Sequence, residues 1–153
     1  VLSTLHTNDA PSTITRLINM GLKPYLITAA LVAIISQRLV KKICPDCKEQ
    51  YTPDNDILYE LNLHDQDLQD KQFYIGRGCS SCNRTGYKGR MSILEIMSVD
   101  EEMCSHIIKQ SSTETIREIA RSNGMSTLLE SGLNAVYSGL TTLEEVARET
   151  SVN

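Results

Sequence analysis

The chain opens with Val1-Leu2-Ser3-Thr4-Leu5-His6-Thr7-Asn8-Asp9-Ala10-Pro11. The apolar residues at its start predict the end of a buried strand, and the polar run that follows predicts a turn. Asn8 or Asp9 is expected to cap the helix that follows, and Pro11 fits its first turn. Ligands bind at the carboxyl ends of strands in open α/β sheets, so this polar turn is a candidate functional site.

The segments after this turn predict the remainder of an α/β layer. A helix is expected over 10–20, because apolar residues recur there at helical spacing and Gly21 follows as a terminator. A second helix is expected over 25–37; it is apolar all round and should be covered on several sides. A short strand over 39–43 completes the order strand, helix, helix, strand. This order is typical of the closing portion of a parallel α/β sheet.

Cysteines occur in two matched pairs, Cys44-Pro45-Asp46-Cys47 and Cys79-Ser80-Ser81-Cys82. Each pair forms a tight turn that directs two sulfurs toward one point, and two such turns complete a tetrahedral thiolate site. Four protein ligands leave no open position, so the sequence predicts a structural Zn²⁺ that does not activate water. The alternatives are unrelated cysteines and a thioredoxin-like redox motif, and the matched set disfavours the redox motif.

The cysteine pairs enclose an acidic segment, 54–70, that contains no lysine or arginine. This composition is typical of a solvated insert, although its leucines could dock a helix. The acidic residues are Asp54, Asp56, Glu60, Asp65, Asp67 and Asp70, and the leucines that could dock a helix are Leu58, Leu61 and Leu68.

From residue 98 onward the chain predicts a small helical subdomain. Capping-box patterns begin at Ser98, Ser111 and Thr141, and a further helix is expected over 127–137. These signals predict three or four short helices.

The composition limits the classes of function. The formal net charge of −4 argues against a general nucleic-acid-binding protein, which usually carries a basic face. The most apolar run, 26–35, is about half the length of the roughly 20 residues that a membrane span needs, so no transmembrane segment is expected. Five cysteines without a secretory signal favour a reducing, cytoplasmic location.

The polar turn resembles the histidine box of the type II secretion and type IV pilus assembly ATPases. The resemblance continues along nearly the whole chain, in Ser3-Thr4-Leu5-His6-Thr7-Asn8, Thr15-Arg16-Leu17, Met20-Gly21, Gln37-Arg38-Leu39, both cysteine pairs and Gly139-Leu140-Thr141-Thr142-Leu143-Glu144-Glu145-Val146. It implies the closing part of a RecA-like P-loop ATPase core over 1–43, a tetracysteine zinc-binding element over 44–97 and a C-terminal helical subdomain over 98–153.

The resemblance also implies that the chain is a C-terminal fragment. The sequence contains no Gly-Lys dipeptide, which a phosphate-binding P-loop requires. In the family the P-loop, an acidic box and a magnesium-binding strand precede the histidine box, and Ile93-Leu94-Glu95, the nearest match to that strand, lies beyond the cysteines. ATP and Mg²⁺ are therefore expected in the intact parent, and the fragment alone is not expected to hydrolyse ATP.

The family assigns roles to residues of the turn and of the following strand. It implies that His6 lies beside the γ-phosphate of ATP and senses its presence. Thr4, Thr7 and Asn8 would orient the histidine around the nucleotide, with helix capping and turn formation as the alternative. Arg38 would reach the nucleotide or a neighbouring subunit, with an ion pair that closes the sheet as the alternative.

Membership would further imply a homohexameric ring that drives an inner-membrane platform protein. The parent would then be cytoplasmic and peripheral to the inner membrane through its partners, and it would serve type II secretion or type IV pilus assembly. The competing interpretation is a stand-alone zinc-ribbon module that binds protein or nucleic acid.

Overall fold

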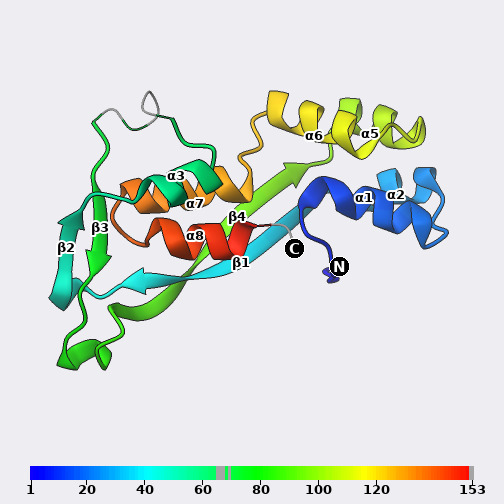
Figure 1. The fold of residues 1–153 in the computed structure, drawn as a ribbon. Coiled ribbons are helices and arrows are strands. Elements are labelled where there is room, and N and C mark those ends of the chain that lie inside the picture. The colour runs from blue at the N-terminus through cyan, green and yellow to red at the C-terminus, as the bar shows by residue number, and fades with distance from the viewer. Residues whose placement is uncertain (65–67, 69, 152–153) are drawn as a thin grey trace. The chain divides into compact units, whose positions relative to one another are not determined.

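A computed structural model describes residues 1–64, 68 and 70–151 of the chain (Figure 1). Two helices precede the first strand, and four consecutive helices follow the last strand. In chain order the elements are α1 (Ala10–Asn19), α2 (Pro24–Ala30), β1 (Ala33–Ile43), the 3₁₀ turn η1 (Pro45–Cys47), β2 (Lys48–Tyr51), α3 (Asn55–Glu60), β3 (Phe73–Gly76), the 3₁₀ turn η2 (Ser80–Cys82), β4 (Tyr87–Ser98), α5 (Glu101–Ile108), α6 (Thr113–Ser122), α7 (Leu128–Tyr137) and α8 (Leu143–Thr150).

The chain divides into two compact units, and each unit combines two separate segments. Unit 1 consists of Val1–Gln37 and Leu94–Leu128, and unit 2 consists of Arg38–Ile93 and Leu129–Asn153. The strands β1 and β4 pair with each other, and each of them continues from one unit into the other.

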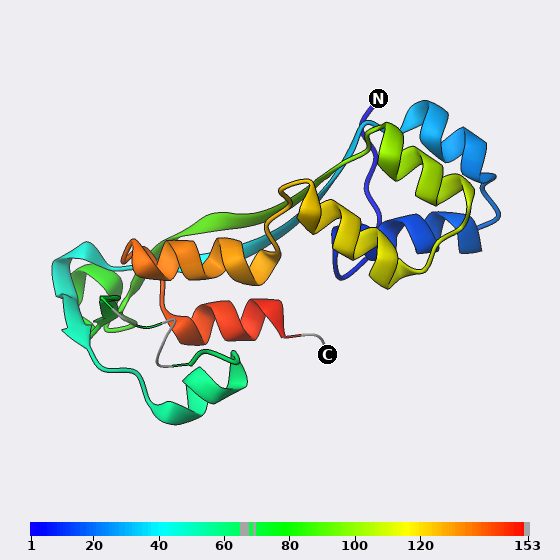
Figure 2. The same ribbon diagram turned by 90° about the horizontal axis from the view of Figure 1, so that it is seen from above.

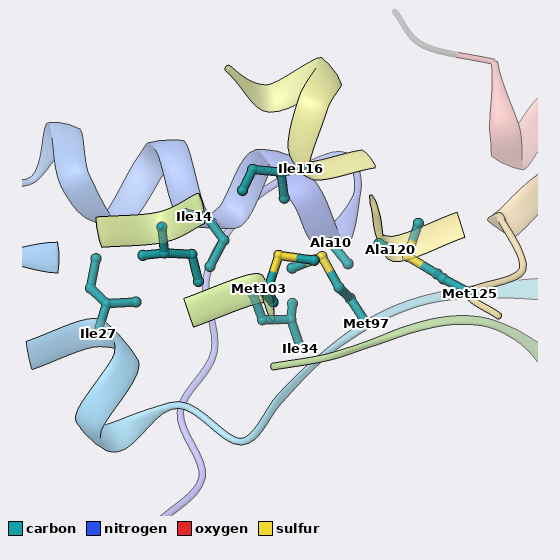
Figure 3. Close-up of a cluster of buried hydrophobic side chains, with 10 residues drawn as sticks. Ala10, Ile14, Ile27, Ile34, Met97, Met103, Ile116, Ala120 and Met125 are labelled. Carbon is teal, nitrogen blue, oxygen red and sulfur yellow. The ribbon is translucent and has the colours of Figure 1, made fainter. Parts of the chain in front are cut away.

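Unit 1 is built around the predicted first helix. α1 begins after Asp9, whose Oδ1 accepts a hydrogen bond from the backbone N–H of Ser12 at 2.8 Å, so Asp9 is the cap of the two predicted candidates, Asn8 and Asp9. Gly21 has φ +89° just after the helix, as a C-terminal stop requires. The buried face of α1 packs with side chains from α2, α5, α6 and the two strands (Figure 3). This cluster comprises Ala10, Ile14, Ile27, Ile34, Met97, Met103, Ile107, Ile116, Ala120 and Met125.

The predicted helix over 25–37 is wrong in its second half. α2 ends at Ala30, and the chain enters β1 at Ala33. In the strand Ile34 is buried, whereas the next residue, Ile35, is 61% exposed, which is the period of two that a strand imposes. The β-branched residues of this run favour a strand. Val32 is 81% exposed, so the expectation of cover on several sides is also wrong for the described chain.

The predicted strand at the start of the chain and the predicted parallel sheet are not found. Residues 1–7 form no helix or strand, and Val1 and Leu2 are fully exposed. A strand needs a neighbour for its backbone groups, and no described segment pairs with this one. The described sheets have two strands each: β2 pairs antiparallel with β3, and the arrows of β1 and β4 in Figure 1 point in opposite directions.

Unit 2 has a core of its own beside the acidic insert. α7 and α8 lie side by side in both views (Figures 1 and 2). Leu61 and Phe73 are buried with Val136, Leu143, Val146 and Ala147. Leu58 and Leu68 also pack against this cluster, so the leucines of the insert do dock α3 and its surroundings. Asp65 and Asp67 lie outside the described residues.

The helices predicted after residue 98 are present, but each predicted cap is one or two residues early. The capping side chains are Asp100 for α5, Ser112 for α6 and Thr142 for α8. α5 and α6 belong to unit 1, whereas nearly all of α7 and the whole of α8 belong to unit 2. Within the described ranges, none of the helices has the length and apolar character needed to cross a bilayer.

Candidate functional site

The four paired cysteines form one cluster in unit 2. Cys44 precedes η1 and Cys47 ends it, just after β1, while Cys79 precedes η2 and Cys82 ends it, between β3 and β4. All four sulfurs lie within 4.8 Å of one another. The long separation in sequence is bridged because β2 pairs with β3 and brings the two turns together.

The spacing of the sulfurs fits a tetrahedral metal. The Cys44–Cys79 and Cys47–Cys82 sulfur pairs are 3.9 Å apart, and the Cys79–Cys82 pair is 3.7 Å apart. Sulfurs at about 2.3 Å from a central Zn²⁺ in a tetrahedron lie about 3.8 Å from each other. The cluster can therefore hold a metal ion such as zinc in a closed four-cysteine site.

Hydrogen bonds from backbone amides and burial give the thiols of Cys82 and Cys47 different pKa values. The N–H groups of Cys79 and Gly86 donate to the sulfur of Cys82 at 3.2 and 3.3 Å, and the first of these bonds contributes most to lowering the pKa of Cys82 to about 6. The N–H of Gly78 donates to the sulfur of Cys47 at 3.2 Å, but burial prevails there and raises the pKa of Cys47 to about 12. Metal binding at neutral pH would therefore release a proton from Cys47, because thiolates are the ligands.

Basic residues near the cysteine turns are partly engaged by carboxylates. Arg77 pairs with Glu49 at 3.0 Å and Lys88 with Asp46 at 3.8 Å, all with well-exposed side chains. Exposed pairs of this kind contribute little to stability. The two pairs nevertheless neutralise Arg77 and Lys88, two of the cations that a nucleic-acid-binding face would use.

The polar turn before α1 is organised by short-range hydrogen bonds. Thr7 Oγ1 lies 2.8 Å from Thr13 Oγ1, and the hydroxyl of Thr13 donates to the carbonyl of Asp9 at 3.2 Å. Thr7 therefore takes part in the turn itself, whereas Thr4, His6 and Asn8 have exposed side chains. The histidine is thus presented to solvent from a turn that is fixed on its C-terminal side.

Arg38 and His6 belong to different units. Arg38 is the first residue of unit 2, whereas His6 is part of unit 1. Arg38 is half-buried in β1. With the residues that the structure describes, Arg38 forms no ion pair, so the predicted ion pair that would close the sheet is not found.

An ion pair ties the histidine turn to α6. Asp9 Oδ2 lies 2.6 Å from Nη2 of Arg117, which also pairs with Glu114. Burial tends to raise the pKa of Asp9, but hydrogen bonds from Ser12 and Arg117 outweigh it and hold this pKa below its ordinary value. A carboxyl group with a depressed pKa stabilises the fold above its unfolded-state pKa, and this contribution is lost as the pH falls through the folded-state pKa.

The variant Asp9→Asn is therefore expected to show a pH-dependent loss of stability. Asparagine is a good helix cap, so the variant removes chiefly the charge that faces Arg117. We expect a loss of about 0.5–1 kcal/mol in urea unfolding at neutral pH, which disappears as the pH falls through the lowered folded-state pKa of Asp9. A loss that persists unchanged in acid would contradict the ion-pair account. Repeating the comparison in an Arg117→Gln background should abolish the difference.

The sequence did not predict that Glu95, noted above only as the end of the match Ile93-Leu94-Glu95, is buried in unit 1. Glu95 of β4 is 4% exposed and accepts hydrogen bonds from two backbone amides. The detectable signal was an acidic residue on the same strand face as Ile93 and Met97, which are both buried. An acidic side chain at a core-facing position requires dedicated partners.

Comparisons with known proteins extend this picture. The family model described as "Type II/IV secretion system protein" matches residues 1–148. The chain is similar to "Type IV pilus assembly ATPase PilB" of Thermus thermophilus, with 47% identity over 150 residues that cover 98% of this chain and 17% of that protein. It is also similar to the Myxococcus xanthus protein of the same name, with 41% identity over 99% of this chain and 27% of the relative.

A relative named for secretion is similar over the same range. "Type II secretion system protein E" of Pseudomonas aeruginosa is 39% identical over 98% of this chain and 29% of its own length. The chain therefore spans less than a third of the length of these curated relatives.

Proposed function

The chain belongs to the type II/IV secretion system protein family, and from this premise we propose that it is the C-terminal part of a traffic ATPase. The intact parent would couple ATP hydrolysis to type II secretion or to type IV pilus assembly. The observation that carries the proposal is the match of the family model to residues 1–148, which include the turn that presents His6. Relatives with both kinds of name are similar to this chain, so the proposal leaves the two systems as alternatives.

His6 is proposed to sense the γ-phosphate of ATP bound by a P-loop elsewhere in the parent. An imidazole N–H can donate to a phosphate oxygen, and it can stabilise the charge that develops there during transfer. The exposed position of His6 supports this role, because its side chain is available to a ligand. Thr4 and Asn8 are proposed to line the nucleotide, Thr7 to hold the turn, and Arg38 to meet the nucleotide or a neighbouring subunit.

The first 43 residues are proposed to close a RecA-like core that the longer parent completes. The start of β1 and the residue before it support this, because Ile34 is buried in the strand while Ile35 is 61% exposed and Val32, just before the strand, is 81% exposed. Strands that are apolar on both faces are typical of sheets covered on both sides. Relatives more than three times as long as this chain contain further segments that would cover such a face.

The cluster of Cys44, Cys47, Cys79 and Cys82 is proposed to hold a structural Zn²⁺ in the element over 44–97. The ion would cross-link two turns that are distant in the sequence. With four cysteine ligands it would have no open coordination position for a substrate or water. The segment over 98–153 is proposed to serve the same machine as its C-terminal helical part. The parent is proposed to act as a homohexamer on an inner-membrane platform protein, at the cytoplasmic face of that membrane.

The variant His6→Ala tests the proposal in the full-length gene product. We expect ATP turnover to fall at least about tenfold, because a contact made to the transferring phosphate is lost, with little change in thermal stability. His106→Ala is the matched control, since that histidine lies in α5 and its Nδ1 is 3.1 Å from Ser111 Oγ. Wild-type turnover in the His6 variant would dismiss the catalytic role.

A further inference from the structure

The starting point is the buried carboxylate of Glu95, which lies outside the metal centre. Its Oε1 accepts a hydrogen bond from the backbone N–H of Ala10 at 2.6 Å, and its Oε2 accepts one from the N–H of Leu128 at 3.4 Å. Ala10 and Leu128 are the first residues of α1 and α7. One carboxylate therefore satisfies an amide at the start of each of two helices.

The choice of a carboxylate at this position has a physical reason. The first amides of a helix have no partner within it, and both amides here belong to buried residues. Helix N-termini carry partial positive charge, so an anion between two of them is favoured. A glutamine would offer one carbonyl oxygen and would turn its NH₂ group toward the other N–H, and an apolar residue would leave both amides without an acceptor.

A short chain of contacts leads from Glu95 to the histidine. Ala10 opens α1, and the first turn of that helix contains Thr13, which is 5% exposed. The Thr13 hydroxyl contacts Thr7 Oγ1 at 2.8 Å, and Thr7 is the neighbour of His6 in the chain. Figure 3 shows Ala10 within the buried cluster of unit 1, so the point that Glu95 holds belongs to a packed core. The turn is thus anchored on its helical side, while the histidine projects from its other side.

We propose that Glu95 is a positioning residue, which fixes the turn that carries His6 and so sets the direction of the imidazole. The inference rests on the proposed role of His6 at the γ-phosphate. Glu95 touches neither the nucleotide nor His6, and it acts through Ala10 and the first turn of α1. Its loss therefore lowers the rate of the step that His6 assists and leaves the affinity for ATP nearly unchanged.

The test combines kinetics and hydrogen exchange on the full-length gene product. The variant Glu95→Leu keeps an apolar filling but removes both acceptors. We expect kcat to fall about fivefold or more while KM for ATP stays within about twofold. The double variant with His6→Ala should be no slower than His6→Ala alone, because both changes remove the same contact. Deuterium uptake should rise in the peptide over 3–12.

A matched control separates positioning from a general loss of a buried carboxylate. Glu145 of α8 is 3% exposed and pairs with Lys41 and Arg148, all in unit 2. The variant Glu145→Leu should lower stability and leave both kcat and the exchange of 3–12 unchanged. If Glu95→Leu fails to fold, Glu95→Gln, which retains one acceptor, should show the same pattern with smaller amplitude.

The outcomes distinguish the two proposals. Unchanged exchange over 3–12 in the Glu95 variant, or additive losses of kcat in the double variant, would overturn the positioning role. If His6→Ala itself retains full turnover, the proposed function of His6 fails. The exchange measurement then decides alone whether Glu95 holds the turn.

Discussion

Removal of the metal from the four-cysteine cluster is expected to lower the melting temperature of the chain by about 10 °C or more, because structural zinc contributes several kcal/mol to folding. The purified protein should contain close to one equivalent of zinc. The physical reason is that a metal held by all four cysteines cross-links two turns that are far apart in the sequence and closes the loop that contains the insert, in addition to the pairing of β2 with β3. Backbone bonds from Cys44 N–H to Gly86 O at 2.9 Å and from Arg77 N–H to Cys47 O at 3.0 Å remain without metal.

The fifth cysteine supplies the control for this experiment. Cys104 lies in α5, outside the cluster, and is half-buried. Cys82→Ser should lose the metal and melt as the chelated protein does, whereas Cys104→Ser should keep the metal and its melting temperature. Less than half an equivalent of metal, together with a melting curve that chelator does not change, would refute the zinc site.

The cysteine cluster and the family were predictable from the sequence because both depend on local signals. A Cys-x-x-Cys turn sets the positions of its own two sulfurs, and two such turns can meet at a single metal. The proximity of Cys44, Cys47, Cys79 and Cys82 confirms this part of the prediction. The resemblance read from the histidine box is likewise confirmed at the level of the family, which matches residues 1–148.

The errors arise where a distant partner decides the structure. The apolar run after Ala30 fits a buried helix or a strand equally well by composition. Its partner is β4, far along the chain, and the N–H of Val99 donates to the carbonyl of Val32 at 2.9 Å. The local periodicity of the sequence cannot predict this pairing, because the partner strand is distant in the sequence. Residues 1–5 show the reverse case, since their apolar pattern predicts a strand for which no described neighbour exists.

The early caps have a related cause. Thr141 satisfies the capping pattern, but its hydroxyl donates to the carbonyl of Lys41 at 2.8 Å, and the next residue, Thr142, caps α8. Ser98 is the last residue of β4, so Asp100 caps α5 instead. The residue that the local pattern assigned to a helix cap is therefore part of a strand in one case, Ser98, and hydrogen-bonded to a strand in the other, Thr141.

Gly86→Ala is expected to destabilise unit 2 severely. A Cβ at Gly86 would overlap the carbonyl oxygen of Gly76, and a Cβ at Gly76 would overlap that of Gly86, so the two backbones meet without room for a side chain. Gly86 also has φ +78°, which disfavours any residue with a Cβ. Because the obstacle is backbone, rotation of a side chain cannot relieve it, and we expect a loss of about 3 kcal/mol or more in urea unfolding.

Gly89→Ala separates the two causes. Gly89 has nearly the same φ, +79°, but a Cβ there would meet nothing within 4 Å. Its variant should therefore show the conformational penalty alone, about 1 kcal/mol. Gly86→Ala should in addition weaken zinc binding in a competition titration, because Gly86 N–H donates to the sulfur of Cys82 at 3.3 Å. Equal losses in the two variants would mean that the backbone contact with Gly76 relaxes at no cost, and that positive φ alone explains the glycine.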